Sequence, residues 1–164
     1  MALTLMRHPE PRVDPGLCYG RSDLELKHPV APKMDTLPAF TTILSSPLQR
    51  ARLLAEAISE RSGIALAVDA GLSEMDFGAW EGQLWDDIPR HDIDAWADDF
   101  HHARPHGGES VAMFAERVSR ALSRAPDGAL LVCHVGVIRA ALVEHGDPEG
   151  WEAKVPFEGV VTLP

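Results

Sequence analysis

Short apolar segments alternate with helical patterns along the chain, and this alternation restricts the fold more than any other feature of the sequence. Four segments have the length and composition of buried strands: 2–6, 41–45, 65–69 and 129–133. Helical patterns separate them, which is typical of βαβ units around a parallel sheet. We therefore predict an α/β fold with a mostly parallel central sheet. Because 164 residues fit one domain, we expect a single domain over 1–164.

The helices that follow these strands can be placed from their end signals. After the second strand, Ser46 is predicted as the N-cap, Pro47 as the first helical residue, and Gly63 as the end of the helix. The other helical patterns, which lack such complete signals at both ends, cover 33–37, 85–100, 111–124 and 135–145.

Composition excludes several classes of partner. The net charge of −10 and the pI near 5.1 argue against nucleic acid or an anionic membrane, because binding to either needs a basic surface. No apolar run approaches the ~20 residues of a membrane-spanning helix, and the N-terminal segment lacks a signal-peptide core. Cys18 and Cys133 form neither a disulfide framework nor a paired zinc motif, and the histidines of 91–106 have no tight metal-ligand spacing. We expect a cytoplasmic protein that needs no metal or other cofactor.

Basic side chains follow three of the predicted strands. Arg7 and His8 come directly after the first strand, and His134 comes directly after the fourth. Arg50 lies in the first turn of the helix after the second strand. The carboxyl ends of parallel strands meet at one edge of the sheet, where α/β folds bind their ligands, and helix N-termini there attract anions. These side chains therefore predict a common anion site.

A loop over this site supplies candidates for a general acid. Segment 71–82 mixes acidic, aromatic and glycine residues without regular periodicity, which is typical of a structured loop over a site. Glu74, Asp76 and Glu81 are all eligible, because aromatic neighbours can desolvate a carboxyl group and raise its pKa. The helical segment 85–100 is expected to cover the same pocket.

Four motifs in order resemble those of the histidine phosphatase superfamily, also called phosphoglycerate-mutase-like. Its Arg-His-Gly corresponds to 7–9 (Arg-His-Pro), and its Ser-Pro-Leu-x-Arg-Ala to 46–51. Its Glu-x-x-Phe-Gly-x-Trp-Glu-Gly corresponds to 74–82, and its later histidine to His134. Segment 17–23 is similar to the Tyr-x-Gly-Arg-x-Asp of the α-ribazole phosphatase-like branch. The resemblance implies a three-layer α/β/α fold of the phosphoglycerate-mutase type.

The same resemblance implies a phosphomonoesterase that acts on a small metabolite phosphate through a covalent phosphohistidine, without a metal. The candidate substrates include α-ribazole-5′-phosphate. His8 would be the nucleophile, and Glu74 would be the general acid and then the general base. The groups implied to bind the phosphoryl oxygens or the substrate are Arg7, Arg50, His134, the backbone N–H near Val135, Tyr19 and Arg21.

Two alternatives stay open at this point. One is a phosphoryl transferase of the phosphoglycerate mutase type. The other is a regulatory module that binds phosphate but turns it over weakly, and it stays open because of two departures from the family pattern, at positions 9 and 14. Pro9 lacks the backbone N–H of the usual glycine, and a charged Asp14 replaces an asparagine that reaches the phosphate in many members. The usual Leu-Thr-x-x-Gly-x-x-Gln is also absent from 26–40.

Overall fold

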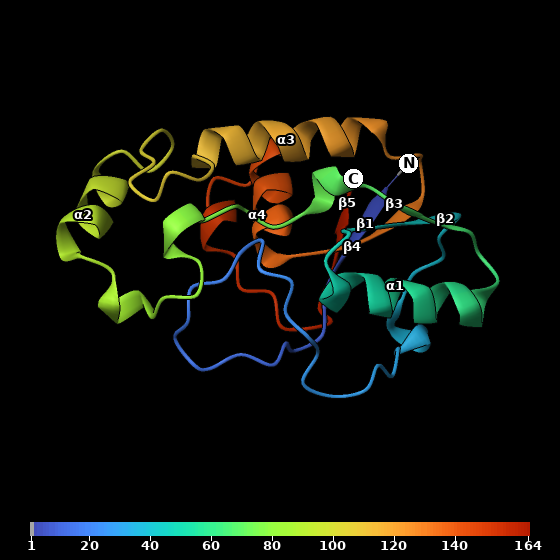
Figure 1. Ribbon diagram of the computed structural model, residues 1–164. Helices are drawn as coiled ribbons and strands as arrows, with labels where there is room; N and C mark the ends of the chain where they lie inside the picture. Colours follow the sequence, from blue (N-terminus) through green and yellow to red (C-terminus); the bar gives the residue numbers. More distant parts are fainter. Residues whose placement is uncertain (1) are drawn as a thin grey trace.

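The computed structural model describes residues 2–164, which form a five-stranded sheet with helices on both faces (Figure 1). The strands are β1 (Leu3–Arg7), β2 (Thr42–Ser45), β3 (Leu66–Val68), β4 (Ala129–Cys133) and β5 (Val160–Leu163). The α-helices are α1 (Gln49–Ser62), α2 (Arg90–Asp98), α3 (Val111–Arg124) and α4 (Val135–Glu144). Short 3-10 helices cover Met34–Thr36, Ala70–Leu72, Gly78–Trp80, Trp85–Asp87 and Gly150–Glu152. The four predicted strands are confirmed.

The sheet has the strand order β3-β2-β4-β1-β5. Neighbours among β1 to β4 pair in parallel, whereas β5 pairs with β1 in the antiparallel direction. The predicted mostly parallel sheet is therefore confirmed, with β4 at its centre. The edge strand β5 is an addition that the alternation of strands and helices did not predict. Because Arg7 pairs with Cys133 and Ser45 pairs with Val132, strands β1, β2 and β4 end at the same edge of the sheet.

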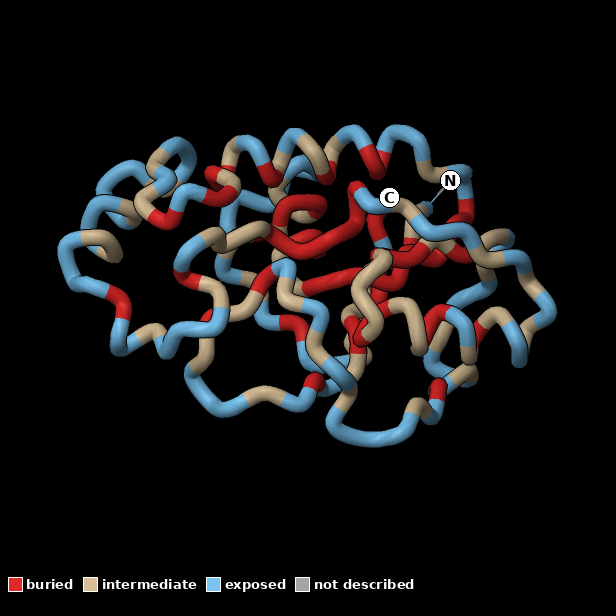
Figure 2. The backbone as a smooth tube through the Cα atoms, viewed as in Figure 1, coloured by how far each residue is buried: buried red, intermediate tan, exposed pale blue. Residues whose placement is uncertain are grey.

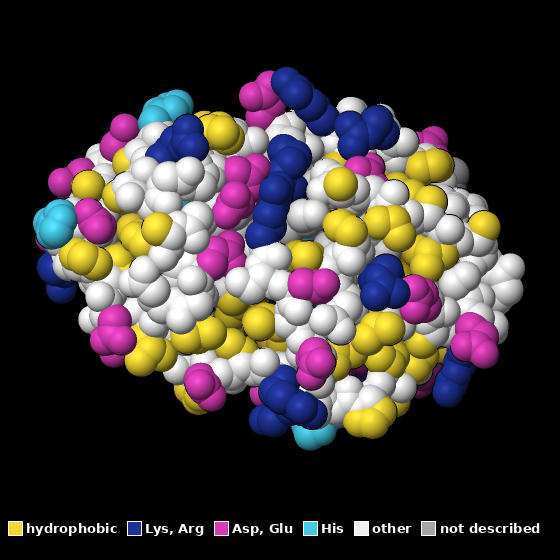
Figure 3. All heavy atoms as spheres, in the orientation of Figure 1, with side chains coloured by type: hydrophobic (Ala, Val, Ile, Leu, Met, Phe, Trp, Pro, Cys, Tyr) yellow, Lys and Arg dark blue, Asp and Glu magenta, His cyan; other side chains and the backbone are white. Residues whose placement is uncertain are grey.

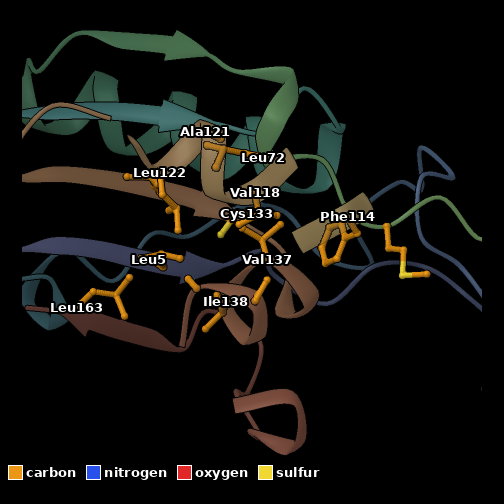
Figure 4. Packing of buried hydrophobic residues seen from close by; sticks show 14 of the residues in the cluster. Leu5, Leu72, Phe114, Val118, Ala121, Leu122, Cys133, Val137, Ile138 and Leu163 are labelled. Carbon is orange, nitrogen blue, oxygen red and sulfur yellow. The ribbon is translucent and has the colours of Figure 1, made fainter. Parts of the chain in front are cut away.

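Two hydrophobic layers flank the sheet because alternate strand residues face opposite sides. Leu5, Leu131 and Cys133 pack against the apolar faces of α3 and α4 (Figure 4). Met6 and Leu130 face the other way, into a cluster with α1. The buried part of the chain concentrates in the central strands and the inner faces of these helices (Figure 2). This arrangement is the expected three-layer α/β/α architecture.

The prediction for the start of α1 is wrong by two residues. Ser46 is not its N-cap and Pro47 is not its first residue, since the helix begins at Gln49. The side chain of Asp23, which is distant in sequence, caps the helix instead: its Oδ1 accepts a hydrogen bond of 2.8 Å from the Gln49 N–H. The Ser46 hydroxyl is hydrogen-bonded to His134 at 2.8 Å and accepts from the Leu48 N–H at 3.2 Å. The predicted end of α1 is confirmed, because Gly63 adopts the left-handed conformation there with φ 71°.

Long connecting segments run over the carboxyl ends of the strands. Residues 8–41 contain only one short 3-10 helix, in agreement with the irregular stretch expected there. Residues 69–110 contain α2 and several 3-10 turns, and α2 lies at one end of the molecule, away from the sheet (Figure 1). Within residues 2–164, no helix combines the length and the apolar character needed to cross a membrane.

Candidate active site

Two histidines meet at the edge of the sheet where β1 and β4 end. The strand register sets them level: the His8 N–H donates to the Cys133 carbonyl at 3.0 Å, one residue before His134. Their ring centroids lie 5.1 Å apart, and both side chains are buried. The predicted meeting of these two strand tips is therefore observed.

The imidazole of His8 is held in one orientation by its own chain. Its Nδ1 lies 2.6 Å from the carbonyl oxygen of Pro9, which can only accept a hydrogen bond, so Nδ1 carries the proton and Nε2 keeps its lone pair. Pro9 stands where the family pattern has a glycine, and it lacks the backbone N–H of that glycine. The hydrogen bond to His8 uses the carbonyl oxygen of Pro9, which a glycine would supply equally. Burial, together with the charges of Arg50 and Arg7, lowers the pKa of His8 to about 3, although the bond to Pro9 opposes the shift. The ring is thus neutral at physiological pH.

The carboxyl group of Glu74 lies at the N-terminus of α4. Its two oxygens accept hydrogen bonds of 3.0 Å, one from the Met75 N–H and one from the Gly136 N–H. Burial raises the pKa of Glu74, while these two bonds and the charges of Arg50 and Arg7 act in the opposite direction. The raised pKa favours the protonated form of the carboxyl group, which is the form that can donate a proton to a leaving group.

His8 and Glu74 line the same cavity, which has a volume of about 270 Å³. Arg7 and Tyr19, from the N-terminal part of the chain, also line it, and so do Val135 and Gly136 at the start of α4. The lining also includes aromatic side chains, namely Trp96 and Phe100 from the predicted cover and Phe77, Phe114 and Trp151. The lining of the cavity therefore combines cationic side chains and a histidine with aromatic side chains that suit a flat organic group.

Arg50 and His134 are fully buried and do not line this cavity. The Arg50 guanidinium donates to the carbonyls of Ser22 at 2.5 Å and Gly20 at 2.6 Å. Burial, and then the charge of Arg50, hold the pKa of His134 well below its usual range, so this ring is also neutral. These two residues supply positive charge and hydrogen-bonding capacity from within the protein, next to His8.

The three eligible acids of the loop have different surroundings. Of these, Glu74 alone lines the cavity. Asp76 accepts from the Gly78 N–H within a local turn, through its Oδ1 at 2.8 Å. Glu81 accepts from backbone N–H groups of the segment Gly20–Ser22. Of the three acids, the tertiary structure therefore brings only Glu74 to the cavity that His8 lines.

Arg21 and Asp14 lie outside the cavity. Arg21 is exposed, and its nearest acidic partner is Glu109, with 3.9 Å between Nη2 and Oε1. The structure does not bring it to the cavity wall, whereas Tyr19, from the same segment, reaches it. Asp14 is also exposed, so its charge does not enter the cavity.

Comparison with known proteins identifies the group to which this arrangement belongs. The family model described as "Histidine phosphatase superfamily (branch 1)" matches residues 3–154. The chain belongs to the histidine phosphatase superfamily. An adenosylcobalamin/alpha-ribazole phosphatase of Escherichia coli (strain K12) is 31% identical over 153 residues, which are 84% of this chain and 75% of that protein.

Solved structures of similar proteins cover almost the whole chain. The alpha-ribazole phosphatase from Shigella flexneri has a TM-score of 0.82 and 26% identity, over 100% of this chain and 90% of that one. A phosphoglycerate mutase from Thermus thermophilus has a TM-score of 0.76 and 33% identity, over 99% of this chain and 92% of that one. The expected phosphoglycerate-mutase-like fold is thereby confirmed.

Several cavity residues of this superfamily member were not predicted as site residues from the sequence, and Arg139 is the charged one among them. Arg139 lines the cavity from α4, and its Nε donates to the Ala153 carbonyl at 2.9 Å. Its spacing provided a usable signal, because Val135 and Arg139 are four residues apart and lie on one face of a helix. On the face seen in Figure 3, basic side chains are interspersed with acidic ones. The chain carries a net charge of −10, so the arginines of the cavity lining, Arg7 and Arg139, are a local concentration of positive charge. Within residues 2–164, no three His, Cys, Asp or Glu side chains are grouped so that they could hold a metal ion.

Proposed function

We propose that this protein is a phosphomonoesterase that hydrolyses a small phosphorylated metabolite through a covalent phosphohistidine. The observation on which the proposal depends is that neutral His8 and protonatable Glu74 line one cavity with Arg7. A nucleophile, an acid and a cation around one space are the groups that phosphoryl transfer requires.

The first step transfers the phosphoryl group to the enzyme. Nε2 of His8 attacks phosphorus in line while the bond from phosphorus to the alcohol oxygen breaks. Glu74 gives its proton to that oxygen, so that the product leaves as a neutral alcohol. Arg7 and the Val135 backbone N–H bind the phosphoryl oxygens, and Arg50 and His134 stabilise the transition state from behind His8.

The second step releases inorganic phosphate. Glu74, now a carboxylate, removes a proton from a water molecule, and the water oxygen attacks phosphorus. The bond from phosphorus to Nε2 breaks, and His8 returns to its neutral state with Nδ1–H still donated to the Pro9 carbonyl. Both enzyme groups end in the protonation states in which they began.

A more specific proposal concerns the identity of the substrate. The aromatic side chains of the cavity fit a leaving group with a flat ring, which stacking on Trp or Phe would retain. Among the relatives, the E. coli and S. flexneri proteins are named for α-ribazole. We therefore propose α-ribazole-5′-phosphate, a riboside phosphate with an aromatic base, as the first substrate to test.

The decisive experiment compares the wild-type protein with His8→Ala on para-nitrophenyl phosphate, followed by a quench in alkaline denaturant that preserves an acid-labile phosphohistidine. We expect turnover of para-nitrophenyl phosphate and a trapped phosphohistidine in the wild type alone. Equal rates in both proteins would refute the mechanism. Phosphate-dependent thermal stabilisation without label or turnover would instead support a binding module.

The mutase remains a second candidate because a Thermus thermophilus phosphoglycerate mutase is among the similar structures. It predicts transfer of the phosphoryl group between phosphoglycerates at a rate above the release of free phosphate. Measuring both products in one reaction separates the two activities.

A further inference from the structure

The mechanism above gives no role to the half-buried carboxylate of Glu81. Glu81 belongs to the same loop as Glu74, and its oxygens accept four hydrogen bonds from the distant segment Gly20–Ser22 and one from Phe77 of its own loop. Oε1 accepts from the Gly20 N–H at 2.9 Å, the Ser22 N–H at 3.0 Å and the Ser22 hydroxyl at 2.6 Å. Oε2 accepts from the Arg21 N–H and the Phe77 N–H, both at 2.9 Å. Three consecutive backbone N–H groups are therefore bound to one side chain.

The carbonyl groups of the same segment bind Arg50. Nη2 of Arg50 donates to the Gly20 carbonyl at 2.6 Å, and Nη1 donates to the Ser22 carbonyl at 2.5 Å. The Tyr19 ring also lies 5.2 Å from the guanidinium carbon. Because segment 19–22 binds Glu81 through its N–H groups and Arg50 through its carbonyls, the position of the guanidinium depends on that of the Glu81 carboxylate.

The fit of segment 19–22 is tight on the Glu81 side. A Cβ added at Gly20 would lie 1.9 Å from the Met75 carbonyl oxygen and 3.1 Å from Glu81 Oε2. The segment therefore has no room to approach the loop more closely. Burial alone would raise the pKa of Glu81, but the bonds from Ser22, Gly20, Phe77 and Arg21 outweigh it and lower the pKa. The hydrogen bonds from these donors need an ionised Glu81, and they also stabilise that ionised form.

Arg50 retains hydrogen-bonding capacity for a ligand. A guanidinium has five N–H groups, and two of them are used by the carbonyls of Gly20 and Ser22. Its Nε is buried and has no hydrogen-bond partner within residues 2–164. Fixing two donors on the segment orients the remaining ones, because the guanidinium is a planar and rigid group.

We propose that Glu81 is a positioning residue, which holds segment 19–22 so that Arg50 is oriented for the phosphoryl group next to His8. The proposal rests on the proposed function in one respect, namely that the anion bound beside His8 is a phosphate. Glu81 itself does not line the cavity and does not touch the substrate.

The test measures the affinity for inorganic phosphate, by calorimetry and by competitive inhibition, in Glu81→Gln. The amide has one acceptor oxygen and places an NH2 group against backbone N–H donors, so the segment should lose its fixed position. We expect phosphate affinity to fall by about tenfold or more, since several charge-assisted hydrogen bonds are lost. The matched control is Glu60→Gln, which removes the same charge from an exposed site on the helix of Arg50 and should leave the affinity unchanged.

A double-mutant cycle with Arg50→Lys separates positioning from general damage to the fold. If Glu81 acts through Arg50, adding Glu81→Gln to Arg50→Lys should lower phosphate affinity by less than about twofold. If the double variant loses phosphate affinity by the product of the two single losses, the proposal is overturned. It is also overturned if Glu81→Gln and Glu60→Gln bind phosphate equally well.

Ser22→Ala provides a milder variant if Glu81→Gln does not fold, as judged by its thermal midpoint. It removes one hydroxyl donor from Glu81 and keeps the backbone bonds, so we expect a smaller loss of affinity in the same direction. An unchanged affinity would contradict the proposal. Because phosphate binding needs no turnover, a protein that binds phosphate with these dependences but hydrolyses nothing would refute the proposed function alone.

Discussion

Gly136 lies against the carboxyl group of Glu74, the proposed general acid, and a methyl group at position 136 should displace that carboxyl group. A Cβ added at Gly136 would lie 2.2 Å from Glu74 Oε1 and 2.9 Å from its Cδ, closer than the 3.0 Å below which something must shift. The carboxyl group must then move by roughly 1 Å, and a displacement of that size can cost about 100-fold in rate. We therefore predict that Gly136→Ala lowers kcat/KM about 100-fold on an alkyl phosphate, whose leaving group needs a proton.

The choice of substrate distinguishes this effect from a general loss of activity. Para-nitrophenolate leaves readily without protonation, so kcat/KM for para-nitrophenyl phosphate should change little in Gly136→Ala. The second step still needs Glu74 as a base, and the variant should therefore release a burst of nitrophenol before a slow steady state. Stopped-flow absorbance measures the burst, and assays of free phosphate measure turnover of the alkyl ester.

Stability and a second substitution provide the controls. Alanine favours a helix over glycine by up to about 1 kcal/mol, so the thermal midpoint of Gly136→Ala should not fall. In a Glu74→Asp background the shorter side chain leaves room for the methyl group, and the further loss from Gly136→Ala should be much smaller than 100-fold. Equal losses of kcat/KM on both phosphate esters would refute the reasoning about Glu74, and so would wild-type rates in a Gly136→Ala protein of unchanged stability.

Three further predictions concern the rest of the molecule. Because the pKa values of His8 and His134 are lowered, the unfolded chain binds more protons than the folded one below pH ~6.5. The free energy of unfolding should therefore fall as the pH decreases toward 3. Denaturant titrations should show that this free energy depends less steeply on pH in His8→Ala than in the wild type. Burial raises the pKa of Cys18 to about 12 and that of Cys133 further, so thiol reagents should label them only upon unfolding, as mass spectrometry can show. Ile58→Ala should cost about 2–5 kcal/mol in urea unfolding without changing kcat, because Ile58 is fully buried between α1 and the sheet, away from the cavity.

The fold could be predicted from the sequence because its main signals are local. The apolar run of β4 is buried along its whole length, as its composition predicted, and strands β1, β2 and β4 end at the same edge of the sheet. Parallel pairing then brings His8 and His134 together, although they are far apart in the chain. The family motifs contain the same histidines.

The start of α1 and the edge strand could not be predicted in the same way. Asp23 caps α1 from a loop 26 residues upstream, and no local rule connects the two positions. Strand β5 has a short apolar sequence that becomes a strand because β1 offers it an open edge. In both cases the decisive hydrogen bonds are made between distant segments.

Local signals were enough to establish the strands, the alternation of strands and helices, and the presence of histidine and arginine at the strand ends, because hydrophobic periodicity and chain direction act over short stretches of sequence. The role of each loop acid, by contrast, depends on tertiary contacts. Glu74 and Glu81 are seven residues apart and share similar neighbours in the chain, yet one lies at the start of α4 beside the cavity and the other binds segment 19–22. They differ because burial and hydrogen-bond partners, which set the protonation of a carboxyl group, come from segments far away in the sequence.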